Sequence, residues 1–149
     1  MSIIVIRGPR FSAAAGTMPP ALPREVLGGL VDRAVGADRT VSVRACSSEA
    51  DLLHALLMAR QARAEIVLLD PGSCVRSPQL EEALKRLGLP YIEVHDDSCE
   101  CPEAVMSGQS GSRLALVNGY MAQSYTLALD IALEHLGCSE YMNEVHVGT

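Results

Sequence analysis

Residues 90–98, with the sequence PYIEVHDDS, change from apolar to polar within a few positions. The first half follows Gly88 and is typical of a short strand buried in a parallel sheet, whereas the second half brings a histidine and two aspartates to the end of that strand. In open α/β sheets, ligands bind outside the carboxyl ends of the strands. We therefore predict that His95, Asp96 and Asp97 lie at a ligand-binding edge.

Strand-like and helix-like patterns alternate along the rest of the chain. Apolar runs or alternating residues predict strands at residues 3–6, 39–46, 65–69, 91–94 and 113–117. Apolar residues at helical spacing predict helices at residues 23–35, from Ser47 or Ser48 onward, from Ser77 or Pro78 to Leu87, near residues 103–106 and at residues 122–136. This alternation predicts an α/β, flavodoxin-like fold: a five-stranded parallel sheet of order 2-1-3-4-5 with helices on both faces.

Capping signals accompany three of the expected helices. Gly36 is expected to end the first helix, and Gly88 the third. Asp51 lies three residues after Ser48, a spacing that resembles a capping box at the start of the second helix.

The composition restricts the class of protein. A chain of 149 residues with 48% hydrophobic residues is expected to fold as one domain, residues 1–138, followed by a polar tail, residues 139–149. A net charge of −6 and 3% aromatic residues argue against nucleic acid as a partner. No apolar run approaches the length of a membrane span, and the first residues read as a strand rather than a signal peptide. We expect a cytoplasmic protein without a membrane partner.

Five cysteines, an odd number, favour reduced thiols over a disulfide framework. Cys99 and Cys101 form a C-x-C close to His95, which leaves a zinc site as an alternative. Structural zinc sites usually show C-x₂₋₄-C pairs, however, and the sequence has no second pair. Glycine-rich nucleotide-binding motifs are also absent from the sequence. The prediction is therefore no metal and no cofactor.

Two further loops are expected to flank the predicted edge, at residues 7–10 and 70–73. Asp70 is a candidate base at a strand end, or it caps the turn before the following proline. The two arginines of residues 7–10 either bind a ligand or form surface or interface contacts. Tyr91 and Tyr125 are expected to be packing residues.

Several stretches in order resemble type II dehydroquinases (type II 3-dehydroquinate dehydratases), up to about Gly137. LPYIEVH matches the family's L-P-x-I-E-V-H almost letter for letter. The other stretches are individually modest: IRGPR resembles N-G-P-N, GTMP resembles the lid G-T-R-E-P, RACSSE resembles R-Q-S-N-H-E, LDPG resembles I-N-P-A/G, and GYMAQSYTLAL resembles the closing helix.

The resemblance implies a mechanism. In the family, a lid tyrosine, activated by a lid arginine, removes a proton beside a ketone, and an asparagine-held water stabilises the enolate. The histidine of I-E-V-H protonates the departing hydroxyl. Backbone amides after that histidine, together with arginines, hold the substrate carboxylate. The family forms trimers, and four trimers form a dodecamer.

Among the family's catalytic positions, the histidine is retained as His95. Residues 21–23 are Ala-Leu-Pro where the lid tyrosine is expected, and no tyrosine precedes Tyr91. The lid arginine falls on residue 17 or 18, Thr or Met, and the water-holding asparagine is replaced by Asp70.

The family's substrate-binding and subunit-contact positions also differ. Arginines replace both asparagines of N-G-P-N, two aspartates and a serine follow the acid, and the arginines of R-E-x-x-R are missing. The positions concerned are Arg7, Arg10, Val75 or Arg76 (for the histidine of T-H-T-S), Asp96, Asp97, Ser98, Pro102, Met106 and, for the intersubunit aspartate, Glu82.

These substitutions favour a remodelled enzyme that acts on, or binds, a small polar carbonyl or cyclic compound. His95 would be the acid or base, with Asp70 or Asp97 as its partner. The aspartates after His95 are expected to repel an anionic substrate. One alternative is an inactive homologue that serves as an oligomeric binding or regulatory protein, and another is a genuine 3-dehydroquinate dehydratase with a displaced base. The predicted catalytic residues are His95 and Asp70, the predicted substrate-binding residues are Arg7, Arg10, Gly72, Arg76, Asp96 and Asp97, and the predicted intersubunit residue is Glu82.

Overall fold

The computed structural model describes residues 2–10, 17–97, 99–100, 103–106 and 112–137. The strands are Ser2–Arg7 (β1), Thr40–Ala45 (β2), Ile66–Asp70 (β3), Tyr91–Val94 (β4) and Arg113–Val117 (β5). The helices are Arg24–Gly36 (α1), Glu49–Gln61 (α2), the short 3₁₀ helix Gly72–Cys74 (η1), Pro78–Leu87 (α3) and Gln123–His135 (α4). The predicted tail, residues 139–149, lies outside the described residues.

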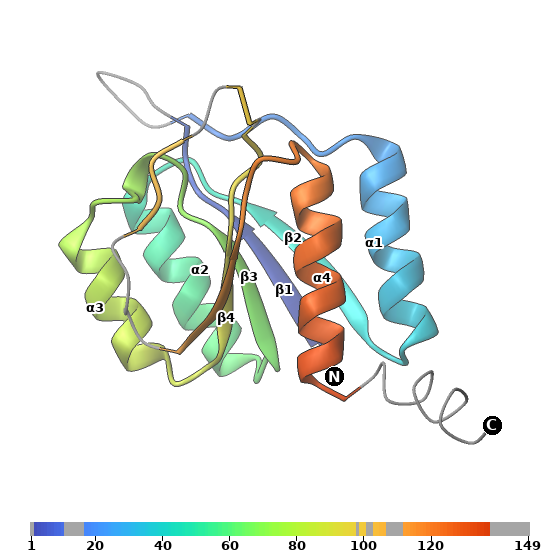
Figure 1. Cartoon of the computed structure of the whole chain (residues 1–149). Coiled ribbons are helices and arrows are strands. Elements are labelled where there is room, and N and C mark those ends of the chain that lie inside the picture. Colours follow the sequence, from blue (N-terminus) through green and yellow to red (C-terminus); the bar gives the residue numbers. More distant parts are fainter. Residues whose placement is uncertain (1, 11–16, 98, 101–102, 107–111, 138–149) are drawn as a thin grey trace.

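The strands form one parallel sheet in the order β2-β1-β3-β4-β5, which confirms the predicted flavodoxin-like topology. In Figure 1, α2 and α3 cover one face of the sheet, and α1 and α4 cover the other. The carboxyl ends of the strands, with the loops that follow them, lie along the upper edge of that view. The sheet thus brings several strand ends together at one edge, where open α/β sheets bind their ligands.

Two apolar clusters, one on each face of the sheet, form the core. β3 is buried at every position, since it lies at the centre of the sheet and contributes to both clusters. A parallel strand covered on both faces is expected to be apolar throughout, and β3 is apolar until its last residue, Asp70. A carboxylate at this buried strand end needs hydrogen-bond partners.

The helix ends follow the sequence signals with one difference. The Ser48 hydroxyl accepts a hydrogen bond from the Asp51 amide at 3.0 Å, and Gly88 closes α3 with a φ of 70°. Both predictions are confirmed. α1 does end at Gly36, but this glycine does not adopt the left-handed conformation of a helix cap. That conformation falls on Asp38, which has a φ of 60°.

The helix predicted near residues 103–106 is wrong, because this segment is irregular. Two of its backbone amides are taken by side-chain carboxylates. The Glu103 amide donates to Asp97 at 2.8 Å, and the Met106 amide donates to Glu93 at 2.8 Å. Side-chain acceptors of this kind compete with helical hydrogen bonds.

Some of the apolar residues at helical spacing are buried and others are exposed. α1 buries Val26, Leu30 and Ala34. Exposed apolar residues on α1, α2 and α4 include Leu27, Val31, Leu57, Leu127 and Ile131. Among the helices of the described residues, none has the length and apolar character that a membrane crossing requires.

Candidate functional site

The loops after β1 and β3 pack backbone against backbone at the carboxyl edge. The Gly8 amide donates to the Asp70 carbonyl at 2.7 Å, and the Ser73 amide donates to the Pro9 carbonyl at 2.8 Å. A Cβ added to Gly8 would lie 2.4 Å from the Pro71 carbonyl oxygen, and one added to Gly72 would lie 2.3 Å from that of Pro9. Glycine is therefore required at both contacts, which hold the two loops, and the arginines beside Gly8, against the end of β3.

Arg7 is the buried cation of this edge, with 3% of its side chain exposed. Its Nε donates to the Tyr125 hydroxyl at 3.0 Å, and its Nη2 donates to Asp96 at 3.0 Å. Its Nη1 donates to the Pro20 carbonyl oxygen. All three nitrogens of the guanidinium are thus engaged within the chain.

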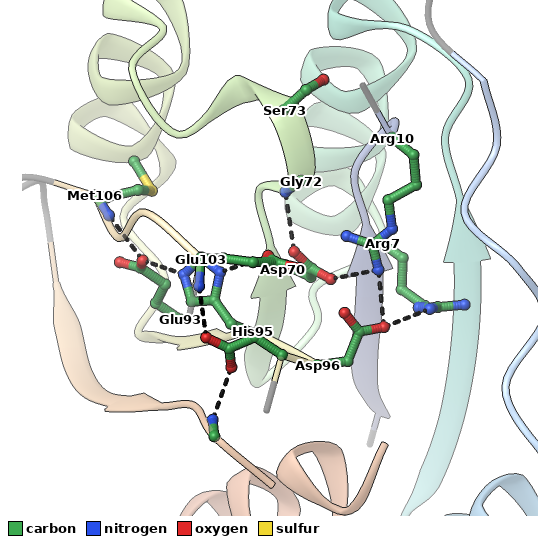
Figure 2. A network of polar contacts seen from close by, with 12 residues as sticks. Arg7, Arg10, Asp70, Gly72, Ser73, Glu93, His95, Asp96, Glu103 and Met106 are labelled. Carbon is green, nitrogen blue, oxygen red and sulfur yellow. Dashed lines mark hydrogen bonds and ion pairs between the residues drawn. The ribbon is translucent and has the colours of Figure 1, made fainter. Parts of the chain in front are cut away.

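Arg10 shares Asp96 with Arg7 and also contacts Asp70, as Figure 2 shows. Its Nη2 lies 2.8 Å from Asp96 Oδ2 and 3.1 Å from Asp70 Oδ2. Asp70 Oδ2 also accepts from the Tyr125 hydroxyl at 2.9 Å, and Asp70 Oδ1 accepts from the Gly72 amide at 2.9 Å. We call Arg7, Arg10, Asp70, Asp96 and Tyr125 the arginine half of the site.

His95 follows β4, and its amide donates to the Val117 carbonyl of β5 at 2.9 Å. Its buried ring lies between two glutamates: Nε2 is 2.6 Å from Glu93 Oε2, and Nδ1 is 3.4 Å from Glu103 Oε2. Glu93 also accepts from Arg113 at 2.9 Å and from the Met106 amide. We call Glu93, His95, Glu103 and Arg113 the histidine half; Figure 2 labels the first three of these residues.

The Asp97 side chain binds backbone amides of two other segments and no charged side chain among the described residues. Its Oδ1 accepts from the Gly119 amide at 2.7 Å, and its Oδ2 accepts from the Glu103 amide. Its carbonyl accepts from the Met121 amide at 2.7 Å. Asp97 therefore holds Glu103 in place beside His95.

The neighbours of these groups shift their acidity. Burial acts to lower the pKa of His95, but the hydrogen bond that its ring donates to Glu93 and the charges of the nearby carboxylates outweigh it, so this pKa is raised above 6.5. For Glu93, burial opposes ionisation, yet hydrogen bonds from His95, the Met106 amide and Arg113 lower its pKa below 4.5. Burial and the charge of Asp70 raise the pKa of Tyr125 well above 10. Both shifts act in favour of an imidazolium beside an ionised Glu93.

Most of the predicted site residues meet at this edge, but two lie elsewhere. Hydrogen bonds join Arg7, Arg10, Asp70, Gly72 and Asp96. A ring nitrogen of His95 lies within 4.8 Å of an Asp70 carboxylate oxygen, and Asp97 follows in the same loop. Arg76 is exposed after η1 and forms none of these hydrogen bonds. Glu82 lies exposed on α3, paired with Arg86 at 3.2 Å.

The structure adds residues that the sequence reasoning missed. Glu93 and Glu103 flank His95, and Arg113 neutralises Glu93. A glutamate inside an otherwise apolar strand signals a paired charge, because ionised side chains are almost never fully buried without a partner. The Tyr125 prediction was incomplete: the ring is buried, but its hydroxyl bridges Arg7 and Asp70.

The geometry defines a class of protein: a flavodoxin-like α/β domain with a charged site at the carboxyl ends of its parallel strands. Comparison with known proteins then gives the family, because the family model described as "Dehydroquinase class II" matches residues 1–133. The chain belongs to this family.

The relatives are distant. The chain is 27% identical over 141 residues to a 3-dehydroquinate dehydratase of Xanthomonas campestris, covering 90% of this chain and 95% of that one. It is 25% identical over 142 residues to one of Hahella chejuensis, covering 91% and 97%. Among solved structures, type II dehydroquinase from Propionibacterium acnes matches with a TM-score of 0.65 and 21% identity, covering 87% and 95%. A 3-dehydroquinate dehydratase-like protein from Bifidobacterium longum gives 0.61 and 21%, covering 91% and 98%.

Proposed function

We propose that this chain is a remodelled member of the dehydroquinase class II family that catalyses proton transfer on a small polar carbonyl or cyclic compound, with His95 as the acid–base group. The observation that carries the proposal is the buried imidazole held between Glu93 and Glu103 at 2.6 and 3.4 Å. A carboxylate that fixes one ring nitrogen orients the other and stabilises the charged form of the ring.

Glu103 supplies the route for the proton. Its side chain is 39% exposed, whereas that of His95 is buried, so Glu103 lies between Nδ1 and solvent. Asp70 is less suited to be the base, since both of its carboxylate oxygens already accept hydrogen bonds, from the Gly72 amide, the Tyr125 hydroxyl and Arg10. We assign proton release and uptake to Glu103, with Asp70 as a fixed charge beside the reacting group.

The arginine half limits the charge of the substrate. Arg7 and Arg10 are the cations of this half, and Asp96 accepts hydrogen bonds from both. An anionic substrate would have to displace this internal carboxylate. A neutral, polar carbonyl compound needs no such exchange, and this favours it over a carboxylate.

The internal pairing of these charges also supports a second candidate, a binding or regulatory protein without turnover. Within the part of the chain that the structure describes, every buried side-chain nitrogen or oxygen has a hydrogen-bond partner. A site whose polar groups satisfy one another is stable without a substrate. This candidate predicts ligand binding without chemistry.

Proton exchange in D₂O separates the candidates, because it detects removal of an α-proton even when no later step follows. We would incubate the protein with a panel of small cyclic and acyclic hydroxyketones, including 3-dehydroquinate, and follow deuterium incorporation by NMR. His95→Gln should slow exchange by roughly 10²–10⁴-fold. Glu100→Gln, an exposed change in the same loop, is the control.

Each outcome supports or refutes one of the three proposed functions. Exchange that His95→Gln leaves unchanged, or no exchange with any compound, would refute the acid–base proposal. Binding of a panel compound without exchange supports the regulatory candidate. Formation of the dehydrated enone from 3-dehydroquinate supports the third reading, a genuine dehydratase with a displaced base.

We also propose that the chain self-associates, as the family's trimers and dodecamers suggest, through the groove between α2 and α3. This groove, of about 550 Å³, is lined by Leu57, which is 48% exposed, and by Glu82. Light scattering on a sizing column should show an oligomer that Leu57→Glu with Glu82→Arg dissociates, while Leu127→Glu on α4 does not. A monomeric wild-type chain would contradict this proposal.

A further inference from the structure

Three side chains at the carboxyl edge could share one metal ion. Asp70, His95 and Glu103 each present a ligand atom, and these atoms all lie within 4.8 Å of one another. They come from the end of β3, the end of β4 and the loop held by Asp97. One imidazole and two carboxylates form a donor set that divalent transition metals accept.

The distance between His95 Nδ1 and Glu103 Oε2 fits a metal better than a hydrogen bond. It is 3.4 Å, beyond the usual range of about 2.7–3.2 Å for N–H···O contacts. Zinc lies ~2.1 Å from nitrogen and carboxylate oxygen, so two such donors at a tetrahedral angle lie roughly 3.4 Å apart. The pair is therefore already spaced for a common ion.

Glu93 supplies the support that a ligating histidine needs. It accepts from His95 Nε2 at 2.6 Å, and this fixes the ring with Nδ1 toward Glu103. A carboxylate on the distal ring nitrogen is the usual companion of a metal-bound histidine. Arg113 and the Met106 amide in turn hold Glu93, so the support is itself rigid.

The remaining two ligands differ in freedom. Asp70 is buried and fixed by the Gly72 amide, Tyr125 and Arg10. Glu103 is 39% exposed, so its carboxylate can adjust its position relative to the other two ligand atoms. It also opens the cluster to solvent, which gives an ion a path of entry and leaves coordination positions for water or a ligand.

We propose that Asp70, His95 and Glu103 bind a divalent transition-metal ion of the zinc class, with Glu93 as the residue that positions His95. This goes beyond the proposed function and does not depend on it. A metal on Nδ1 would occupy the atom through which His95 exchanges its proton with Glu103. Bound metal and the proposed acid–base step therefore exclude each other, and the ion would act as an inhibitor.

The test uses the full chain, treated with a chelator and dialysed. Zn²⁺ is titrated by calorimetry, and Co²⁺ by its visible absorption, which reports coordination directly. We expect one site, at which Glu103→Gln weakens binding at least tenfold and Glu93→Gln weakens it roughly 10–100-fold. Glu100→Gln and the double change Cys99→Ser with Cys101→Ser should leave affinity unchanged.

The decisive variant is Glu103→Gln, because the exposed side chain can change without unfolding the protein. Zinc affinity unaffected by this change would overturn the proposal, as would binding that is lost in the double cysteine variant. Metal binding is measured without any substrate, so the metal-site proposal is tested independently of the acid–base proposal. Where exchange is observed, added Zn²⁺ should suppress it in the wild type.

Discussion

The arginine half and the histidine half share one sheet edge, but they balance charge in different ways. In the arginine half, Arg7 and Arg10 both bind Asp96, and Arg10 also reaches Asp70. In the histidine half, two glutamates flank one imidazole, and Arg113 pairs with Glu93. The first half closes on itself, whereas the second is balanced when His95 carries a proton or shares a cation.

This comparison changes the physical reason for expecting an anionic ligand to be disfavoured. Asp96 is neutralised by both arginines, and Asp97 accepts two backbone amides. The positive charge of Arg7 and Arg10 does not lie across an open pocket from the aspartates, because the side chains meet. This difference is the reason why we propose acid–base chemistry for the histidine half, whose net charge depends on the protonation of His95.

The largest effect is expected from Glu93→Ala. It removes the acceptor for Arg113, His95 and the Met106 amide, and breaking a buried ion pair costs about 3–5 kcal/mol. Urea unfolding measures the loss. The control is Asp130→Ala, which breaks an exposed pair with Arg33 and should cost at most about 1 kcal/mol. Equal losses would mean that Glu93 is not a structural centre.

A smaller loss is expected from Arg7→Met in the arginine half. Asp96 keeps its bond to Arg10, and Tyr125 keeps its bond to Asp70, so the network remains partly satisfied. The lost charged hydrogen bonds cost roughly 1.5–3 kcal/mol. Urea unfolding again provides the measurement. A loss larger than that of Glu93→Ala would reverse the ranking of the two halves.

The third-largest loss of stability is expected from His95→Gln, and its size depends on pH. Because the folded-state pKa of His95 is raised above 6.5, its protonated ring stabilises the fold fully below that pH. This contribution is lost as pH rises through the folded-state pKa. The wild type should therefore exceed the variant most at low pH and least at high pH. Unfolding is measured in chelator, above pH 4.5, where the lowered pKa of Glu93 keeps it ionised. A difference that does not change with pH would show that folding leaves the pKa of His95 unshifted.

The smallest effect on stability is expected from Glu103→Gln. Its side chain is 39% exposed, so its contact with His95 is screened by solvent and is worth at most about 1 kcal/mol. Thermal unfolding should hardly change, while metal binding and proton exchange should. A large loss of stability would place Glu103 among the structural residues instead.

The fold was predictable because its signals are local. The β4 and β5 bounds agree with the predicted runs, and Ser48 and Gly88 cap helices where their residue types require. The irregular segment at residues 103–106 was not predictable in this way. Its amides bind Asp97 and Glu93, and a pattern within the segment does not reveal acceptors elsewhere in the chain.

The sequence by itself determined the parallel sheet, its strand order and the position of His95 at the carboxyl edge, because apolar periodicity and turn residues act over short distances. Only the tertiary structure decided which charges meet. Arg7 and Asp96 are 89 positions apart, and Tyr125 and Asp70 are 55 apart. Their pairing depends on the two glycine contacts that press the β1 and β3 loops together. The stretch PYIEVHDDS therefore contributed to both halves: Glu93 and His95 to the histidine half, and Asp96 to the arginine half.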